Sequence, residues 1–311
     1  SSGTNLVITF NGSATPTAVT ALVKNITYQD TDTNAPTTGA RTVRYVLTDG
    51  DGGTSANYDT TVTVSGVNDA PVVDLNAGGA GQDVTTAFTE QTPVLIAPVG
   101  TLTDVDSATL TALTVTLTAR LDGDGVESLS LNGAATTAAS GASLTVNYTA
   151  ATGVLSITGS ATPAVYQTVL QGLLYNNTSD QPTPSNRSIT VVAHDGTLPS
   201  ATQTVTLTVA AVNDAPAGAN GTITATEDTD YTFAPADFGF SDVDGHNLDR
   251  VWFTTVPAQG TLRWNGNTIS ANDFVVAWDI ASGLVTYRPP ADANGAALTS
   301  FTFQVQDDGG T

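Results

Sequence analysis

The 311-residue chain contains no cysteine and no methionine, and its one lysine is Lys24. Without cysteine there is no disulfide framework, zinc ribbon, cysteine nucleophile or iron–sulfur site. No apolar run approaches the roughly 18 residues that a membrane-spanning helix needs, and the first residues do not resemble a secretory signal. We therefore predict no membrane insertion. The missing initiator methionine predicts that the chain is a processed or excised piece of a longer protein.

Basic side chains are also scarce, with 8 against 29 acidic ones and a formal net charge of -21. The excess is spread along the chain, at -3 for residues 1–71, -9 for 72–216 and -9 for 217–311. Such a surface repels phosphate groups, so we predict no nucleic acid or anionic lipid as a partner. Hydrophobic residues make up 40%, which is enough for folded cores.

Two motifs occur twice. The sequence VNDAP stands at Val67–Pro71 and again at Val212–Pro216, and GSATP stands at Gly12–Pro16 and again at Gly159–Pro163. An interval of about 145 residues corresponds to whole domains and not to the rungs of a solenoid. We predict three units: the C-terminal half of a truncated repeat (1–71), a complete long repeat (72–216), and a divergent repeat that lacks its last strand (217–311).

Most of the chain alternates Thr with Val, Leu or Ile, which is typical of strands with one buried and one exposed face. The predicted strands include Thr60–Val64, Leu113–Thr118, Leu144–Tyr148, Ser188–Ala193 and Thr204–Val209. Only Val165–Leu174 has helical spacing, and we expect a turn or two of helix there. Many short strands separated by turns rich in Gly, Asn and Asp indicate an all-β string of sandwiches.

Aspartates gather where the predicted strands end, most clearly in the two D-V-D motifs at Asp104/Asp106 and Asp242/Asp244. Two carboxylates in such a motif point the same way and can meet one ion. Calcium takes six to eight oxygen ligands at about 2.3–2.6 Å. Carboxylates packed so closely repel one another unless a cation lies between them. Asp also favours turns without any metal, and this is our interpretation of four other acids, Asp122, Asp124, Asp180 and Asp292.

The VNDAP linker, the following D-V-D and the final-strand Asp together resemble the bacterial cadherin-like repeats of large secreted adhesins. The resemblance covers essentially the whole chain. It implies tandem Ig- or cadherin-like β-sandwich domains in an elongated array, with Ca²⁺ bound at each junction. The linker lacks the longer D-x-N-D-N form of animal cadherins, which leaves the number of ions per junction open.

The same resemblance implies the ligands. At the first junction they are Asn68, Asp69, Asp104, Asp106 and Asp195. At the second junction they are Asn213, Asp214, Asp242, Asp244 and Asp307. Two glutamates near the starts of their domains match an early Glu of the family, Glu90 and Glu227, and Glu90 is expected to serve the junction after its own domain.

The predicted function is a calcium-stiffened extension module of a large extracellular bacterial adhesin or surface fibre. Its expected partners are other copies or neighbouring repeats, with cell-surface glycans or proteins as further candidates. The alternative is a carbohydrate-binding head in the third unit, which holds all three tryptophans, Trp252, Trp264 and Trp278. We expect these rings in the core, with Trp264 partly exposed beside a hairpin turn.

No enzyme is predicted, because the three glutamates and the two histidines form no convergent acid–base pair. His194 is interpreted as a strand-edge residue. His246 borders the second D-V-D motif, although sites for hard cations rarely include imidazole.

Overall fold

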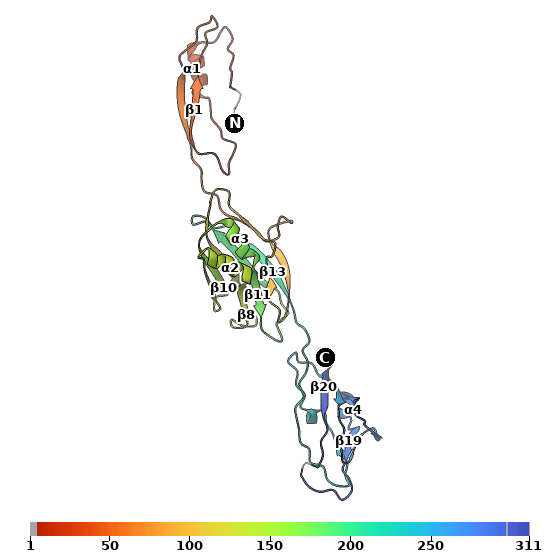
Figure 1. The fold of residues 1–311 in the computed structure, drawn as a ribbon. Coiled ribbons are helices and arrows are strands. Elements are labelled where there is room, and N and C mark those ends of the chain that lie inside the picture. Colours follow the sequence, from red (N-terminus) through yellow and green to blue (C-terminus); the bar gives the residue numbers. More distant parts are fainter. Residues whose placement is uncertain (1–4, 297, 311) are drawn as a thin grey trace.

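The computed structural model describes residues 5–296 and 298–310 and shows three parts in a line, joined by short linkers (Figure 1). The predicted all-β class is confirmed, since sheets dominate the described chain. The last strand ends beside the linker that enters the third part, which brings the C-terminal aspartates to the second junction (Figure 1). No helix in the described ranges is long and apolar enough to cross a membrane.

The first part contains helix α1 (Pro16–Lys24) and an antiparallel pair of strands, β1 (Gly39–Tyr45) and β2 (Tyr58–Val64). The hydroxyl of Thr15 accepts a hydrogen bond from the Ala18 N–H at 3.3 Å and so caps the helix. No residue between 5 and 70 is buried, so the described portion of this part has no core of its own.

The middle part is a sandwich with two helices. Its elements are β3 (Val72–Asp74), β4 (Val84–Thr89), β5 (Val94–Leu95), β6 (Thr101–Thr103), β7 (Leu110–Leu117), β8 (Glu127–Leu131), α2 (Gly133–Gly141), β9 (Thr145–Thr149), β10 (Val154–Ala161), α3 (Pro163–Gln171), β11 (Leu173–Asn177), β12 (Arg187–His194) and β13 (Gln203–Ala210). A six-stranded sheet has the order β4-β13-β12-β7-β10-β9, and a three-stranded sheet has the order β5-β11-β8. Strands β3 and β6 form a separate pair.

Alternate residues of the long central strands enter the core of the middle part. Leu113, Val115 and Leu117 of β7 are fully buried, and Phe88 packs edge-on against Tyr175 with ring centroids 5.0 Å apart. Strand β4 runs parallel to β13, from Val84 opposite Val205 to Thr89 opposite Ala210. This register ends the strand next to the second linker and places Glu90 there.

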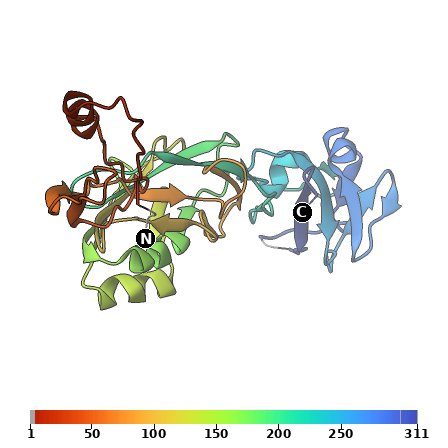
Figure 2. The same ribbon diagram turned by 90° about the horizontal axis from the view of Figure 1, so that it is seen from above.

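The third part packs two smaller sheets around a core rich in phenylalanine. Its elements are β14 (Tyr231–Thr232), η1 (Pro235–Phe238), β15 (Leu248–Phe253), β16 (Thr261–Trp264), β17 (Asn267–Thr268), β18 (Asp273–Val276), α4 (Ala277–Ala281), β19 (Val285–Arg288) and β20 (Phe303–Asp307). The sheets have the orders β14-β19-β16-β17 and β18-β15-β20. Figure 2 shows this part well separated from the helices of the middle part.

Two sequence predictions need correction. The helix expected at Val165–Leu174 exists as α3 but ends before Gly172, and the residues after Gly172 form β11. The core prediction for the tryptophans was wrong. Trp252 is 37% exposed and Trp278 is 73% exposed, while Trp264 is 39% exposed, as expected. The core of the third part is filled by phenylalanines such as Phe238 and Phe253 instead.

Candidate metal-binding junctions

At the first junction, the linker residues contact the aspartates at the top of the middle part. The Asn68 side chain donates from Nδ2 to Asp195 Oδ2 at 2.7 Å. The Asp69 backbone N–H donates to Asp106 Oδ2 at 3.2 Å, and Ser107 Oγ donates to Asn68 Oδ1 at 3.4 Å. The linker, the D-V-D turn after β6 and the end of β12 therefore form one polar cluster.

Two carboxylates of this cluster differ in their partners. Asp104 Oδ1 accepts the N–H groups of Asp106 at 3.1 Å and Ser107 at 2.7 Å, whereas Asp104 Oδ2 is buried and accepts no hydrogen bond from the described residues. The Asp195 side chain is 1% exposed. Burial opposes its ionisation, but hydrogen bonds from Asn68 and from the Leu198 N–H outweigh burial and lower its pKa. Asp195 is therefore a buried anion.

The second junction repeats the pattern with equivalent residues. Asn213 Nδ2 donates to Asp307 Oδ2 at 2.9 Å, and the Asp214 N–H donates to Asp244 Oδ2 at 2.7 Å. Asp242 Oδ1 accepts the His246 N–H at 2.9 Å, while Asp242 Oδ2 is buried without a hydrogen bond in the described chain. The structure thus brings together the linker, the D-V-D motif and a strand-end aspartate at both junctions, although Asp195 follows β12 and not the final strand β13 of the middle part as expected, whereas Asp307 ends β20.

Glu90 reaches the second junction from the middle part, on the far side of the linker. It is 5% exposed, and Oε2 has no hydrogen-bond partner among the described residues. Burial is the main cause that raises the pKa of Glu90, and the negative charges of Asp214, Asp244 and Asp180 raise it further. A cation placed among these groups would reverse both effects.

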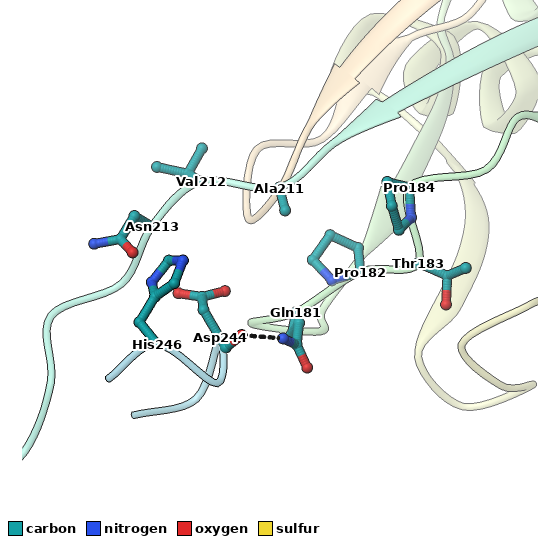
Figure 3. A pocket seen from close by; sticks show the side chains of 9 residues that line it. All are labelled: Gln181, Pro182, Thr183, Pro184, Ala211, Val212, Asn213, Asp244 and His246. Carbon is teal, nitrogen blue, oxygen red and sulfur yellow. Dashed lines mark hydrogen bonds between the residues drawn. The ribbon is translucent and has the colours of Figure 1, made fainter. Parts of the chain in front are cut away.

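Gln181 and His246, which sequence reasoning did not predict as ligands, also lie at this junction. Gln181 Nε2 donates to the Asp244 carbonyl at 2.6 Å, so the middle and third parts touch directly (Figure 3). The residues around this contact line a hollow of about 500 Å³, and His246 faces Asp244 there. The signal for His246 was its place two residues after the D-V-D motif, whereas Gln181 lies in a loop that carries no local signal.

Glu227 does not join the second cluster. It is exposed, in the turn where the Thr229 N–H bonds the Thr226 carbonyl, and the group of ligand-type side chains found in the described chain consists of Asp242, Asp244 and His246. The Asp244 carboxylate, by contrast, is half-buried and within 4.8 Å of its neighbours in that group.

Both junctions fit a hard cation, because they offer carboxylate and amide oxygens, and three of the carboxylate oxygens, Asp104 Oδ2, Asp242 Oδ2 and Glu90 Oε2, are buried without a hydrogen bond in the described chain. The oxygens of Asp104 and Asp195 serve the first junction, and those of Asp242 and Glu90 serve the second. These are the ligand types that calcium prefers. A bound divalent ion would supply the positive charge that the repelling carboxylates lack.

Glu90→Gln tests separately how the Glu90 carboxyl group affects stability without metal and how it affects calcium affinity. Without metal, the raised pKa means that the contribution of Glu90 to stability is full below its unfolded pKa and is lost as the pH rises through its folded pKa. We therefore expect the metal-free variant to be more stable than the parent at neutral pH in urea unfolding. Even outer partners of metal ligands are worth about 10–100-fold in affinity, so calcium binding by calorimetry should weaken at least about tenfold. Glu227→Gln, the exposed control, should change neither quantity. Equal calcium affinity for Glu90→Gln and the parent contradicts the assignment.

Comparison with known proteins gives the domain class of the C-terminal part. Residues 213–311 match the family model described as a bacterial Ig domain. No curated protein matches the chain. Among solved structures, EC21-23 of human CDH23 is similar over 86% of this chain and 73% of that one, at 13% identity and a TM-score of 0.36. Extracellular cadherin domains 3-6 of protocadherin gamma B2 are similar over 83% of this chain and 51% of that one, at 16% identity and a TM-score of 0.30. The C-terminal part is thus similar to bacterial Ig domains, and the match begins at the linker residue Asn213.

Proposed function

We propose that the chain is a non-enzymatic extension module of an extracellular bacterial adhesin or surface fibre, and that calcium stiffens its junctions. The observation that carries the proposal is the presence, at both junctions, of buried carboxylate oxygens without hydrogen-bond donors in the described chain: Asp104 Oδ2 at the first, and Asp242 Oδ2 and Glu90 Oε2 at the second. Buried anionic oxygens without partners are costly unless a cation neutralises them.

The mechanism follows from charge. The middle and third units each have a net charge of -9, and the carboxyl group of Glu90 is close to the negative charges of Asp214 in the linker and of Asp244 in the third unit. In the absence of metal these groups repel and the linker bends. A divalent ion shared between Glu90 and the carboxylates after the linker holds the two units in one orientation. Extracellular calcium modules bind at about 10⁻⁴–10⁻³ M, so the array is stiff outside the cell.

The bacterial Ig match at residues 213–311 supports an extracellular, surface-exposed setting for the module. We propose the unit boundaries at residues 71 and 216, since one hydrophobic core spans Val73–Leu207 and another spans Phe233–Tyr287. As partners we propose neighbouring repeats and other copies of the same chain, joined in tandem or in a fibre.

Small-angle X-ray scattering tests the stiffening. At millimolar calcium we expect one maximum dimension and a narrow distribution of shapes, and with chelator a shorter and broader distribution. Magnesium at equal ionic strength is the control for simple charge screening, because it demands a tighter octahedral site. Calcium at 100 times Kd should also add about 2.7 kcal/mol to the stability of the folded state. Superimposable scattering curves with calcium and with chelator overturn the proposal.

The exposed aromatic rings favour carbohydrate binding as a second candidate function. Trp252 and Phe274 lie side by side on one sheet with ring centroids 5.0 Å apart, and the Arg250 guanidinium lies 4.9 Å from the Phe274 centroid. Trp278, on α4, is the most exposed tryptophan. Aromatic faces of this kind can stack on sugar rings. A glycan array with the whole chain tests this, and tryptophan fluorescence that no sugar changes counts against it.

A further inference from the structure

The two junctions differ in one side chain that bears directly on metal choice. The D-V-D motif of the first junction continues with Ser107 and Ala108, whereas that of the second continues with Gly245 and His246. The first junction is therefore built from oxygen ligands. The second brings an imidazole to the same place, and imidazole suits zinc and its neighbours among the divalent metals better than it suits calcium.

His246 lies within reach of two carboxylates. One ligand atom each from Asp242, Asp244 and His246 lies within 4.8 Å of the others. His246 Nδ1 is 3.9 Å from Asp242 Oδ1 and 4.0 Å from Asp307 Oδ2. Zinc bonds of about 2.0–2.2 Å place tetrahedral ligands about 3.3–3.6 Å apart, so a small rotation of these side chains closes the site.

Two of these groups are also buried and unsatisfied. The Asp242 side chain is 1% exposed, and its Oδ2 accepts no hydrogen bond within the described chain. His246 Nδ1 is buried and likewise has no hydrogen bond in the described chain. A buried carboxylate oxygen and a buried ring nitrogen in one cluster, both without a hydrogen bond in the described chain, call for an explanation, and a bound metal ion would satisfy both.

His194 at the first junction provides a natural comparison. Its side chain is as exposed as that of His246, and its Nδ1 is also 3.9 Å from a junction aspartate, Asp195. Yet His194 Nδ1 accepts the Gly196 N–H at 2.8 Å, so this nitrogen is committed to a backbone hydrogen bond. Proximity to an aspartate therefore occurs at both junctions, but of the two Nδ1 atoms only that of His246 is without a hydrogen bond in the described chain.

A glycine packs closely against that nitrogen. A Cβ at position 309 would lie 2.5 Å from His246 Nδ1 and closer still to Asn213 Oδ1, a distance that real Cβ atoms do not show. Two residues after the final-strand aspartate, the first junction has Thr197 where the second has Gly309. At the second junction, Gly309 therefore lets the backbone pack closely against His246 and Asn213, next to a ring nitrogen that has no hydrogen bond in the described chain.

We propose that the second junction binds a Zn²⁺-class divalent ion through His246 Nδ1, Asp242 and Asp244, while the first junction binds only hard cations such as calcium. This inference rests on the proposed role of the junction carboxylates as cation ligands. It makes the linker at residues 211–216 responsive to a second metal, so the second hinge responds to calcium and to zinc, whereas the first responds to hard cations alone.

Titration calorimetry with Zn²⁺ on the whole chain, free of any histidine tag and stripped by chelator, tests the proposal. We expect one zinc ion bound at least about tenfold more tightly than calcium, since imidazole and carboxylate donors favour zinc. His246→Asn should lose at least about tenfold in zinc affinity, while His194→Asn should bind zinc like the parent. Cobalt(II) should give a visible absorption band in the parent and in His194→Asn and lose it in His246→Asn.

Gly309→Ala provides a second variant that keeps every ligand residue, but its methyl group would force the His246 imidazole to shift, so it should weaken zinc binding as His246→Asn does. Circular dichroism checks that both variants fold. We expect folding to be retained in His246→Asn, because the half-exposed His246 side chain contributes no hydrogen bond of its own in the described chain. Unchanged zinc affinity in His246→Asn, or zinc no tighter than calcium in the parent, overturns the proposal. Tight zinc binding without any effect of calcium on the scattering contradicts the proposed calcium function but supports the zinc site.

Discussion

Replacing Arg187 with methionine is expected to lower the free energy of unfolding of the middle unit by about 3–5 kcal/mol, the usual cost of breaking a buried ion pair. Arg187 is 1% exposed. Its Nε donates to Glu127 Oε2 at 2.9 Å, and its NH2 group donates to Asp122 Oδ2 at 2.7 Å. Without the guanidinium, two carboxylates would remain buried side by side with no positive charge between them. Urea unfolding followed by circular dichroism measures the loss.

The effect is large because the other partners of these carboxylates cannot replace the charge. Tyr175 donates its hydroxyl to Glu127 Oε2 at 2.7 Å, and Asn177 Nδ2 donates to Asp122 Oδ2 at 2.7 Å. Both are neutral donors. The pKa of Tyr175 is raised, first by burial and then by its bond to Glu127, so its hydroxyl stays protonated and donating.

Asp124→Asn is the matched control in the same unit. Asp124 is 55% exposed and pairs with Arg120 at 2.6 Å. Exposed ion pairs are worth about 0–1 kcal/mol, so this variant should unfold close to the parent. Similar losses in the two variants would show that the Arg187 cluster contributes no more than a surface pair.

Asp195→Asn is expected to abolish calcium binding at the first junction and to leave the second junction intact. The asparagine side chain still accepts a backbone N–H through Oδ1, so the turn after β12 should keep its shape. The charge that a cation needs is lost, and affinity should fall at least about tenfold, as even outer partners of metal ligands are worth that much. Calorimetry should show fewer ions per chain, and scattering should show flexibility restored at one linker only.

The control for Asp195→Asn is Asp74→Asn. Asp74 ends β3, and its two oxygens accept the N–H groups of Asn76 and Gly78, both at 2.9 Å. It has the same charge in the same unit but lies outside the junction cluster. Calcium stoichiometry should therefore equal that of the parent. A full complement of ions in Asp195→Asn would remove Asp195 from the ligand set.

The strands could be predicted from the sequence because their signal is local. Alternation of Thr with Val or Leu puts every second side chain in the core, and β7 and β12 show this burial pattern directly. Helix α1 could also have been predicted, since the repeated GSATP motif ends in the Thr-Pro that starts both α1 and α3. Helix α2 has a weaker sequence signal, because its buried residues are only the alanines Ala135 and Ala139.

Part of the candidate site could likewise be predicted from the sequence, and part could not. Linker and D-V-D residues are close in sequence to the strands they follow, so the motif was enough to select them. The ion-pair partner of Asp122 could not be predicted, since Asp122 and Arg187 are 65 residues apart in the sequence and only packing joins them. The close packing of Gly309 against His246 likewise joins distant parts of the chain, next to the pairing of β15 with β20. The turn interpretation of Asp122 therefore missed its buried ion pair.

Strand β13 runs straight into the linker at residues 211–216, between β12 on one side and the parallel β4 on the other. A pull on the third unit is directed along the axis of β13. The backbone hydrogen bonds on both sides of β13 are then loaded in shear. They must break together and not one after another. The module is thus arranged to transmit tension through its middle sandwich, with Glu90 placed where that load leaves the sheet.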